Sequence, residues 1–250
     1  MKIQNLSLSF RGTTLLEKIS FSVKKGEVVA LLGESGSGKS LLLKALARLL
    51  NSNFHLRADT FCVEEKKVLE LSKSQLRVLR SELALILQDA QLSLYPYLDV
   101  GALFHLLLKT HTNLNTKERK RKAFECLESL GFAELELLWH SYVFELSVGM
   151  ARRVSLALAL VCEPKFLLCD EITSSLDEEN TKKIVQILKN IKANKACIFA
   201  THDLKIAKEL SDRVLVLQQG TILHNMNTCD FFQQDTFYSR LYKELYVRSE

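Results

Sequence analysis

Residues 33–40 have the chemistry of a phosphate-binding loop. They read Gly33-Glu34-Ser35-Gly36-Ser37-Gly38-Lys39-Ser40, a complete G-x-x-x-x-G-K-[ST] pattern. Glycines let backbone N–H groups approach phosphate oxygens closely, and the start of the next helix adds its own N–H groups. Lys39 is expected to reach the β- and γ-phosphates of a nucleotide, and Ser40 to ligate Mg²⁺. The alternative is a Gly/Ser turn that only begins a helix.

The neighbours of this loop favour phosphate binding. Residues 28–32 form an apolar, strand-like run, and residues 41–50 form a leucine-rich helical run. A strand, a glycine-rich loop and a helix in this order are the context that a phosphate-binding loop requires. The sequence therefore predicts a nucleotide site between residues 28 and 50.

Two adjacent acids form a second candidate site. Residues 166–169 are apolar and strand-like, and Asp170 and Glu171 follow them directly. Carboxylates at the end of a buried strand lose hydration, and Mg²⁺ with its waters would compensate for that loss. We expect Asp170 to bind the metal through water and Glu171 to orient or deprotonate an attacking water. An acid pair at a helix N-terminus is the alternative.

The order of the remaining elements predicts an α/β fold. Alternating residues from Ile3 to Phe10 and from Ile19 to Val23 indicate strands at the N-terminus. Further along we expect strands at 83–87, 166–169, 196–200 and finally 213–217, and helical segments at 100–160, 178–191 and 230–246. The β-α-β order from 166 to 200 predicts a parallel sheet that binds ligands at the carboxyl ends of its strands.

Composition excludes several classes of protein. The 250 residues are 47% hydrophobic and 25% charged, enough for one large α/β domain or a core with an inserted subdomain. No apolar run is long enough to span a membrane, and the N-terminus lacks the apolar core of a signal peptide, so a cytoplasmic chain is expected. The six cysteines form no C-x-x-C pair and are expected to be free thiols.

Charge does not identify a partner. The net charge is only +5, and its densest run, residues 117–122, precedes an amphipathic helical pattern. We interpret this run as a solvated helix face, with a patch for nucleic acid or anionic lipid as the alternative. Nucleic-acid binding is not expected from so small a charge.

Further motifs make the sequence resemble the ATP-binding-cassette (ABC) ATPases from residue 6 to about residue 242. Leu146-Ser147-Val148-Gly149-Met150 resembles the family's signature, and Thr201-His202-Asp203 its switch histidine. Ser174-Ser175-Leu176-Asp177 is similar to the D-loop, Gln88 to the Q-loop glutamine, and Phe10 to the aromatic residue that stacks on adenine. These motifs follow one another in the family's order.

The resemblance implies a fold and a division of the chain. The expected fold is a P-loop NTPase core with a parallel sheet, an N-terminal antiparallel β edge and an inserted helical subdomain. The core would comprise about residues 1–88 and 158–250 of a single nucleotide-binding domain, and the helical insert about residues 89–157.

The resemblance also implies a mechanism in which two cassettes share ATP and Mg²⁺. Ser147, Gly149 and Asp177 would complete the site of a second cassette, and His202 would contact the γ-phosphate. Gln88 would contact the metal and link the phosphate state to a membrane partner. The implied partners are two permease subunits and an extracytoplasmic solute-binding protein, with this chain at the cytoplasmic face of the plasma membrane.

Residues 87–96 and the pair Val100-Gly101 place the resemblance among import ATPases for dipeptides, oligopeptides and nickel. Ala90 and Tyr95 replace that branch's usual Pro and Asn. The short end near Glu250 is more similar to the nickel subunits. The alternative function is a non-transport ABC ATPase of DNA repair or of the ribosome.

Two residues depart from the family pattern. Val148 replaces the first signature glycine, and Ile172 replaces the Pro that usually follows the acid pair. A branched side chain at Val148 would restrict the approach of a phosphate to the signature. We therefore expect a slow composite site where this signature is used.

Overall fold

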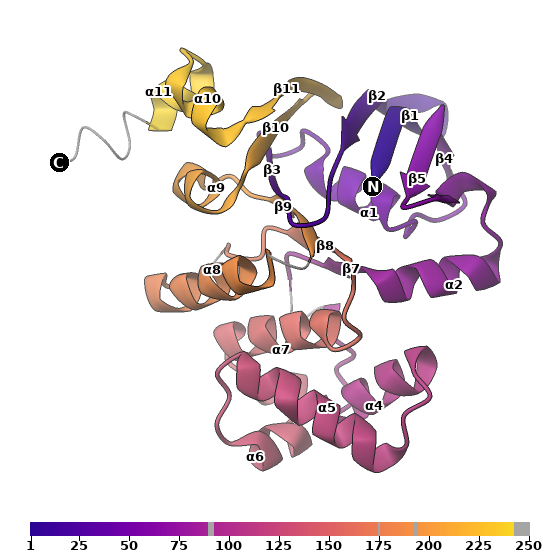
Figure 1. Cartoon of the computed structure of the whole chain (residues 1–250), viewed down its shortest axis with the longest axis vertical. Coiled ribbons are helices and arrows are strands. Elements are labelled where there is room, and N and C mark those ends of the chain that lie inside the picture. Colours follow the sequence, from indigo (N-terminus) through magenta and orange to yellow (C-terminus); the bar gives the residue numbers. More distant parts are fainter. Residues whose placement is uncertain (90–92, 175, 193–194, 243–250) are drawn as a thin grey trace.

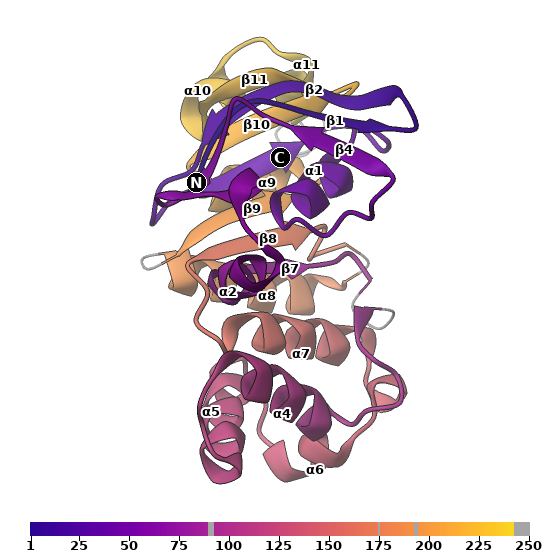
Figure 2. The ribbon, with the colours of Figure 1, turned by 90° about the vertical axis from the view of Figure 1, so that its right-hand side faces the viewer.

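The computed structural model of the chain describes residues 1–89, 93–174, 176–192 and 195–242. Two β-sheets and a group of helices build the molecule (Figure 1). Figure 2 shows the same arrangement from the side, with the smaller sheet at one end and helices α4 to α7 at the other. The larger sheet extends from beside the smaller sheet towards these helices.

Over the described residues, the larger sheet has six strands in the order β11-β10-β3-β9-β8-β7. The strands β3, β7, β8, β9 and β10 are mutually parallel, and β11 is antiparallel to β10. Their bounds are β3 Val28–Leu32, β7 Leu83–Ile86, β8 Phe166–Asp170, β9 Ala196–Ala200, β10 Arg213–Gln218 and β11 Thr221–Asn227. The predicted parallel sheet is confirmed.

The smaller sheet is antiparallel and is organised around β1, which pairs with β2, β4 and β5. Its strands are β1 Lys2–Phe10, β2 Thr13–Ser22, β4 Phe54–Arg57, β5 Thr60–Val63 and β6 Lys66–Lys67. The N-terminal antiparallel β edge is therefore confirmed. Strands β4 to β6 were not predicted, because all three are short and because β4 and β5 pair with β1, which is distant in the sequence.

The central strand β3 shows why the sequence runs apolar without a break. All five of its residues are buried, and they alternate between two separate cores. Val28, Ala30 and Leu32 face the helices, whereas Val29 and Leu31 face the smaller sheet and helix α1. A strand covered on both faces needs apolar side chains at every position.

Four helices pack together at the end away from the smaller sheet (Figures 1 and 2). They are α4 Val100–His111, α5 Thr116–Ser129, α6 Leu135–His140 and α7 Val148–Leu160. Trp139 lies at their centre, stacked on Phe104, and a Cβ on Gly101 would come within 2.5 Å of its ring. Helix α7 continues past residue 157 and packs against β7. The division into core and insert stays a prediction.

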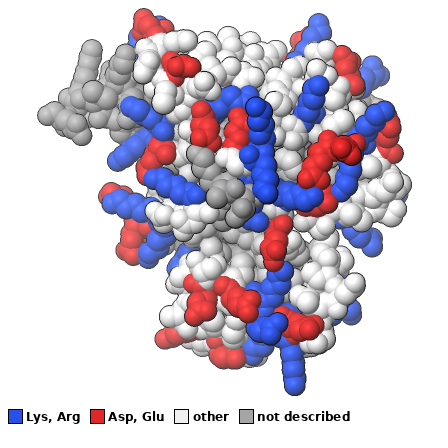
Figure 3. Space-filling view, in the orientation of Figure 1, with Lys and Arg blue, Asp and Glu red and all other residues white. Residues whose placement is uncertain are grey.

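The other helices are α1 Lys39–Leu46, α2 Lys73–Glu82, α8 Glu178–Lys192, α9 Leu204–Leu210, α10 Thr228–Gln233 and α11 Phe237–Tyr242. Two short 3-10 segments are also present, Val68–Glu70 and Val143–Glu145. None of the helices among the described residues combines the length and the apolar character needed to cross a bilayer. On the face in Figure 3, positive and negative side chains are interspersed.

Three sequence predictions of elements were wrong in part. The strand at 213–217 is not the last, because β11 follows after a turn at Gly220, whose φ is 77°. The first helix ends at Leu46 rather than at residue 50. The tail contains two short helices, α10 and α11, instead of one, and residues 243–246 of the predicted helix lie outside the described range.

Candidate nucleotide site

The loop at residues 33–40 closes around its own lysine. Lys39 is only 6% exposed, and its Nζ donates to the carbonyl oxygens of Gly33 at 2.8 Å and Glu34 at 3.0 Å. Burial lowers the pKa of this ammonium group, and the nearby Glu171 and Asp170 carboxylates partly oppose that shift. The loop backbone thus surrounds a charged group, an arrangement suited to phosphate binding.

Glycine is required at two positions of this loop. Gly33 has a φ of 155°, and a Cβ there would lie 2.3 Å from the Leu217 carbonyl oxygen and 2.6 Å from Ser37 Oγ. Gly38 has a φ of 104° immediately before α1. Ser37 Oγ is buried, and no described group bonds to it. The loop therefore presents an unused hydroxyl group beside its backbone N–H groups.

Ser40 and Asp170 come together from distant parts of the chain. Ser40 Oγ donates to Asp170 Oδ1 at 3.0 Å, and Asp170 is 3% exposed at the end of β8. Burial raises the pKa of the Asp170 carboxyl group, and the Ser40 hydrogen bond partly opposes this rise. A hydroxyl and a buried carboxylate are oxygen donors that suit Mg²⁺, so the residues present fit the implied metal.

Three side chains meet at the ends of adjacent strands. Gln88 Nε2 donates to Glu171 Oε2 at 3.2 Å, and His202 Nδ1 lies 3.5 Å from the same oxygen. Gln88, Glu171 and His202 follow β7, β8 and β9, which are neighbours in the sheet. Parallel strands bring their carboxyl ends to one edge of the sheet. This explains why Gln88 and His202 both lie at Glu171, although they are 83 and 31 positions away from it in the sequence.

Glu171 has an unusual backbone conformation. Its φ is 47°, in the left-handed region that non-glycine residues rarely adopt. The Glu171 N–H donates to Ala200 O at 3.1 Å, and the Glu171 carbonyl accepts from Ser174 N at 3.0 Å and Ser174 Oγ at 2.8 Å. Three hydrogen bonds therefore hold the conformation that aims this carboxylate at Gln88 and His202.

A cavity of about 550 Å³ joins these parts. It is lined by Ser35, Gly36, Gly38, Lys39, Ser40, Leu41, Gln88, Glu171 and His202. Gly33, Glu34 and Ser37 were also predicted to bind nucleotide. They belong to the same loop but do not line the cavity. Leu41 was not predicted; it is the residue that follows the motif's last position, and its backbone enters the first turn of α1.

The other predicted residues lie apart from this cavity. The Phe10 ring packs on Phe54 with centroids 4.8 Å apart, and the Arg11 guanidinium lies 5.3 Å from the Phe10 centroid. Ser147 caps α7 by accepting from Met150 N at 3.2 Å. The structure thus does not bring Phe10 or Ser147 to the loop of their own chain.

Gly149 and Asp177 meet through Asn180. A Cβ on Gly149 would lie 2.9 Å from Asn180 Oδ1, and Asp177 accepts hydrogen bonds from the backbone N–H and side-chain amide of Asn180 at 2.7 and 2.8 Å. We call Ser147, Val148, Gly149, Asp177 and Asn180 the signature face. Residues 90–92 and Ser175, also part of the predicted motifs, lie outside the described residues.

Sequence reasoning missed Arg152. This arginine lies on α7 and is 3% exposed, with its guanidinium beside the carbonyl oxygens of Leu87, Gln88 and Ser174. The sequence offered one weak signal: Arg152 is a charged residue at a position of α7 that faces the core.

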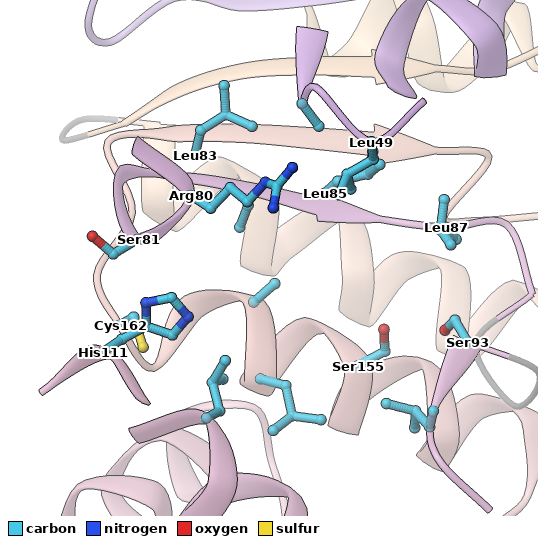
Figure 4. Close-up of a pocket in the computed structure, with 16 residues that line it drawn as sticks. Leu49, Arg80, Ser81, Leu83, Leu85, Leu87, Ser93, His111, Ser155 and Cys162 are labelled. Carbon is cyan, nitrogen blue, oxygen red and sulfur yellow. The ribbon is translucent and has the colours of Figure 1, made fainter. Parts of the chain in front are cut away.

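A second cavity of about 320 Å³ lies on the other side of Leu87. Figure 4 shows leucines of β7 along one wall, with Arg80, His111, Ser155 and Cys162 around them. Arg80 and His111 are the basic residues among the labelled side chains, and burial lowers the pKa of His111. This cavity has none of the carboxylates of the nucleotide site.

Together, a phosphate loop, a buried Ser–Asp pair and a carboxylate at parallel strand ends define a P-loop nucleoside triphosphatase. A family model described as "ABC transporter" matches residues 16–174. The oligopeptide transport ATP-binding protein AppD of Bacillus subtilis is 34% identical over 221 residues, which are 87% of this chain and 67% of that protein. The oligopeptide transport ATP-binding protein OppD of Escherichia coli is 34% identical over 242 residues, 94% of this chain and 71% of that protein.

A solved structure gives the same result. The ATP-binding cassette MJ0796, in a dimeric post-hydrolysis state bound to ADP and Pi, superposes with a TM-score of 0.78 at 26% identity, over 91% of this chain and 98% of that one. The chain belongs to the ABC transporter family. It is an ABC ATPase, and ATP is its nucleotide.

Proposed function

We propose that this chain is the ATP-hydrolysing subunit of an importer and that Glu171 is its catalytic carboxylate. The observation that carries the proposal is the Glu171 carboxylate at the mouth of the loop cavity, with Gln88 and His202 on one of its oxygens. A carboxylate so placed can orient an attacking water and accept its proton.

The other residues divide the remaining work. Lys39 and the loop N–H groups bind the β- and γ-phosphates, and His202 contacts the γ-phosphate. Ser40 and Asp170 would hold Mg²⁺, Asp170 through water, and Gln88 would contact the metal as well. When bound, the metal neutralises charge on the phosphates. Phe10 would stack on adenine.

The functional unit is a pair of cassettes. Ser147 and Gly149 are at the N-terminus of α7, a 13-residue helix whose positive end attracts a phosphate. Both lie away from the loop of their own chain, so they serve the nucleotide of a second cassette, with Asp177 beside them. The dimeric state named for the solved cassette supports this arrangement.

The transported solute is a peptide. The two relatives reported above are named as oligopeptide transport proteins, which also favours transport over a role in DNA repair or on the ribosome. Neither name includes nickel, which stays a sequence prediction. Two permeases and an extracytoplasmic binding protein complete the transporter, with this chain at the cytoplasmic face of the membrane.

The apolar cavity of Figure 4 is where a permease segment docks. Leu87 lines this cavity, and the next residue, Gln88, donates a hydrogen bond to Glu171. A displacement of Leu87 by a docked segment would therefore be passed to the catalytic carboxylate through the adjacent residue. Filling the cavity with Ala159→Trp should abolish the stimulation of hydrolysis by solute in the assembled transporter. ATP binding by the isolated chain should stay within about twofold, because Ala159 is outside the nucleotide site.

Glu171→Gln tests the catalytic proposal. The amide keeps the shape of the carboxylate and removes its basicity, so hydrolysis should fall about a hundredfold or more while ATP binding remains. Size-exclusion chromatography in Mg-ATP should show the variant as a trapped dimer. Persistent turnover together with no gain of dimer would disprove the assignment.

A further inference from the structure

Arg152 is a buried arginine whose side chain bridges two separate loops. Its Nη1 donates to Leu87 O at 3.2 Å and to Gln88 O, and its Nη2 lies 3.4 Å from Ser174 O. Leu87 and Gln88 follow β7, whereas Ser174 follows β8. One side chain of α7 therefore holds the backbone of two loops from neighbouring strands.

Both loops contact Glu171. The Gln88 amide donates to the Glu171 carboxylate at 3.2 Å, and Ser174 donates to the Glu171 carbonyl through its N–H and its hydroxyl group at 3.0 and 2.8 Å. The first loop thus fixes the side chain of Glu171, and the second fixes its backbone. Arg152 is one hydrogen bond away from each of these contacts.

Stability alone does not account for a charge at this place. Burial lowers the pKa of Arg152, although the Asp89 carboxylate opposes the shift, and Arg152 Nε is buried with no described partner. A buried guanidinium loses hydration that its hydrogen bonds must replace, and neutral side chains of similar volume are often as stable or more so. Its planar fork of donors, however, can bind several carbonyl groups in one fixed geometry.

We propose that Arg152 is a positioning residue that sets the place of the Glu171 carboxylate according to the position of α7. The same helix begins at Ser147, on the signature face, so a shift of α7 when a second cassette docks moves the Gln88 and Ser174 loops together. Docking of the second cassette thereby adjusts the catalytic carboxylate of this chain's own site. This inference rests on the proposed catalytic role of Glu171.

Arg153 provides a matched control on the same helix. Its guanidinium lies 4.4 Å from the centroid of Phe132, and its Nη1 donates to the carbonyl oxygens of Leu130 and Gly131 at 3.3 and 3.2 Å. Burial lowers the pKa of Arg153 as it does that of Arg152. Arg153 is therefore a partly buried cation bonded to carbonyl groups, but its partners lie among helices α4 to α7 and not beside Glu171.

The first experiment compares Arg152→Gln with Arg153→Gln in the full chain. Both variants should lower Tm, because each loses hydrogen bonds to carbonyl groups. Arg152→Gln should also lower kcat about 10- to 100-fold with the KM for ATP within about twofold, since a displacement of about 1 Å at a reacting group can cost a hundredfold. Arg153→Gln should leave kcat within about twofold. Equal kcat values for the two variants at equal Tm would overturn the proposal.

Two further variants extend the test if Arg152→Gln does not fold. Arg152→Lys keeps the positive charge but loses the planar set of guanidinium donors, so it should retain only part of the wild-type kcat. Ser174→Ala keeps Arg152 and removes one hydrogen bond to Glu171, and should lower kcat several-fold with KM unchanged. Wild-type kcat in Ser174→Ala and Arg152→Lys together would overturn the proposal.

A double variant separates this inference from the proposed function. If Arg152 acts through Glu171, adding Arg152→Gln to Glu171→Gln should not reduce single-turnover hydrolysis further, because the carboxylate that Arg152 positions is already absent. A further tenfold loss would mean that Arg152 acts elsewhere and would overturn the inference alone. Full turnover in Glu171→Gln by itself would overturn the catalytic role of Glu171 and with it this inference.

Discussion

The loop cavity and the signature face are built in opposite ways. The cavity gathers residues from four segments of the chain around a buried lysine and a buried aspartate. The signature face joins the starts of two helices, α7 and α8: Val148 of α7 is 48% exposed, and Gly149 of α7 packs on Asn180 of α8. All residues that line the cavity come from one chain, whereas the signature face is proposed to serve the nucleotide of a second cassette.

This difference separates binding from hydrolysis. Substitutions in the phosphate-binding loop of the cavity, such as Lys39, should change the affinity of a single chain for ATP. Substitutions on the signature face should leave that affinity intact and change only what happens when two cassettes meet. The following predictions test this separation.

The largest effect is expected for Lys39→Ala. The ammonium group is the one cation among the residues that line the cavity, and its hydrogen bonds to phosphate are charge-assisted. ATP affinity should therefore fall about a hundredfold or more, as measured by equilibrium binding of a fluorescent ATP analogue. Lys44→Ala, on the same helix, is the control and should bind as the wild type does. Unchanged affinity in Lys39→Ala would refute the loop assignment.

Gly149→Ala should have a smaller effect, confined to dimers. Its Cβ would come within 2.9 Å of the Asn180 side chain, so either Asn180 or the start of α7 must shift. We expect ATP-induced dimerisation to weaken about tenfold, measured by analytical ultracentrifugation, with ATP affinity of the monomer unchanged. Adding Asn180→Ala removes the clash and should restore most of the loss. A fall in monomer affinity would break the separation of the two surfaces.

Asp170→Asn should change thermal stability by a few degrees. Because the pKa of Asp170 is raised on folding, the nucleotide-free chain binds a proton more readily when folded, so this group's contribution to stability increases as pH falls through the raised pKa. The Asn variant should lose that dependence and have a Tm about 2–4 °C higher at pH 7. Scanning calorimetry from pH 5 to 8 would measure both. Mg-ATP should reverse the order; a lower Tm for the variant without Mg-ATP would contradict this account.

Val148→Gly should have the smallest effect. If the valine limits the approach of a partner's phosphate, the glycine should raise turnover at the partner's site a few-fold. The gain should be clearest in a transporter whose own Glu171 is changed to Gln, because only the partner's site then turns over. No gain in that background would show that Val148 is a tolerated substitution and that the two sites do not differ on its account.

Local motifs could be read from the sequence, and long-range pairing could not. The loop at residues 33–40 and the pair Asp170-Glu171 each form one continuous segment, so their chemistry is visible without the fold. Helix α2 was missed because Leu79 is its one buried residue, although Ser72 and Gln75 form a capping box that could have indicated its start. Strands β4 and β5 contribute four residues each and depend on β1 for pairing.

Arg152 was missed for a different reason. Its role depends on carbonyl oxygens of Leu87, Gln88 and Ser174, which any residue type would supply. Backbone acceptors carry no signal in a sequence. Contacts of this kind become visible only when the fold places a donor beside them.

The left-handed backbone of Glu171 has a consequence for the evolution of the protein. A non-glycine residue at a φ of 47° costs about 1–2 kcal/mol, whereas asparagine adopts this region with less strain. Glu171→Asn should therefore fold more stably than Glu171→Gln, although both lose the carboxylate that hydrolysis requires. Glutamate at position 171 supports hydrolysis but does not give the most stable protein. Selection for stability alone would therefore favour an inactive cassette.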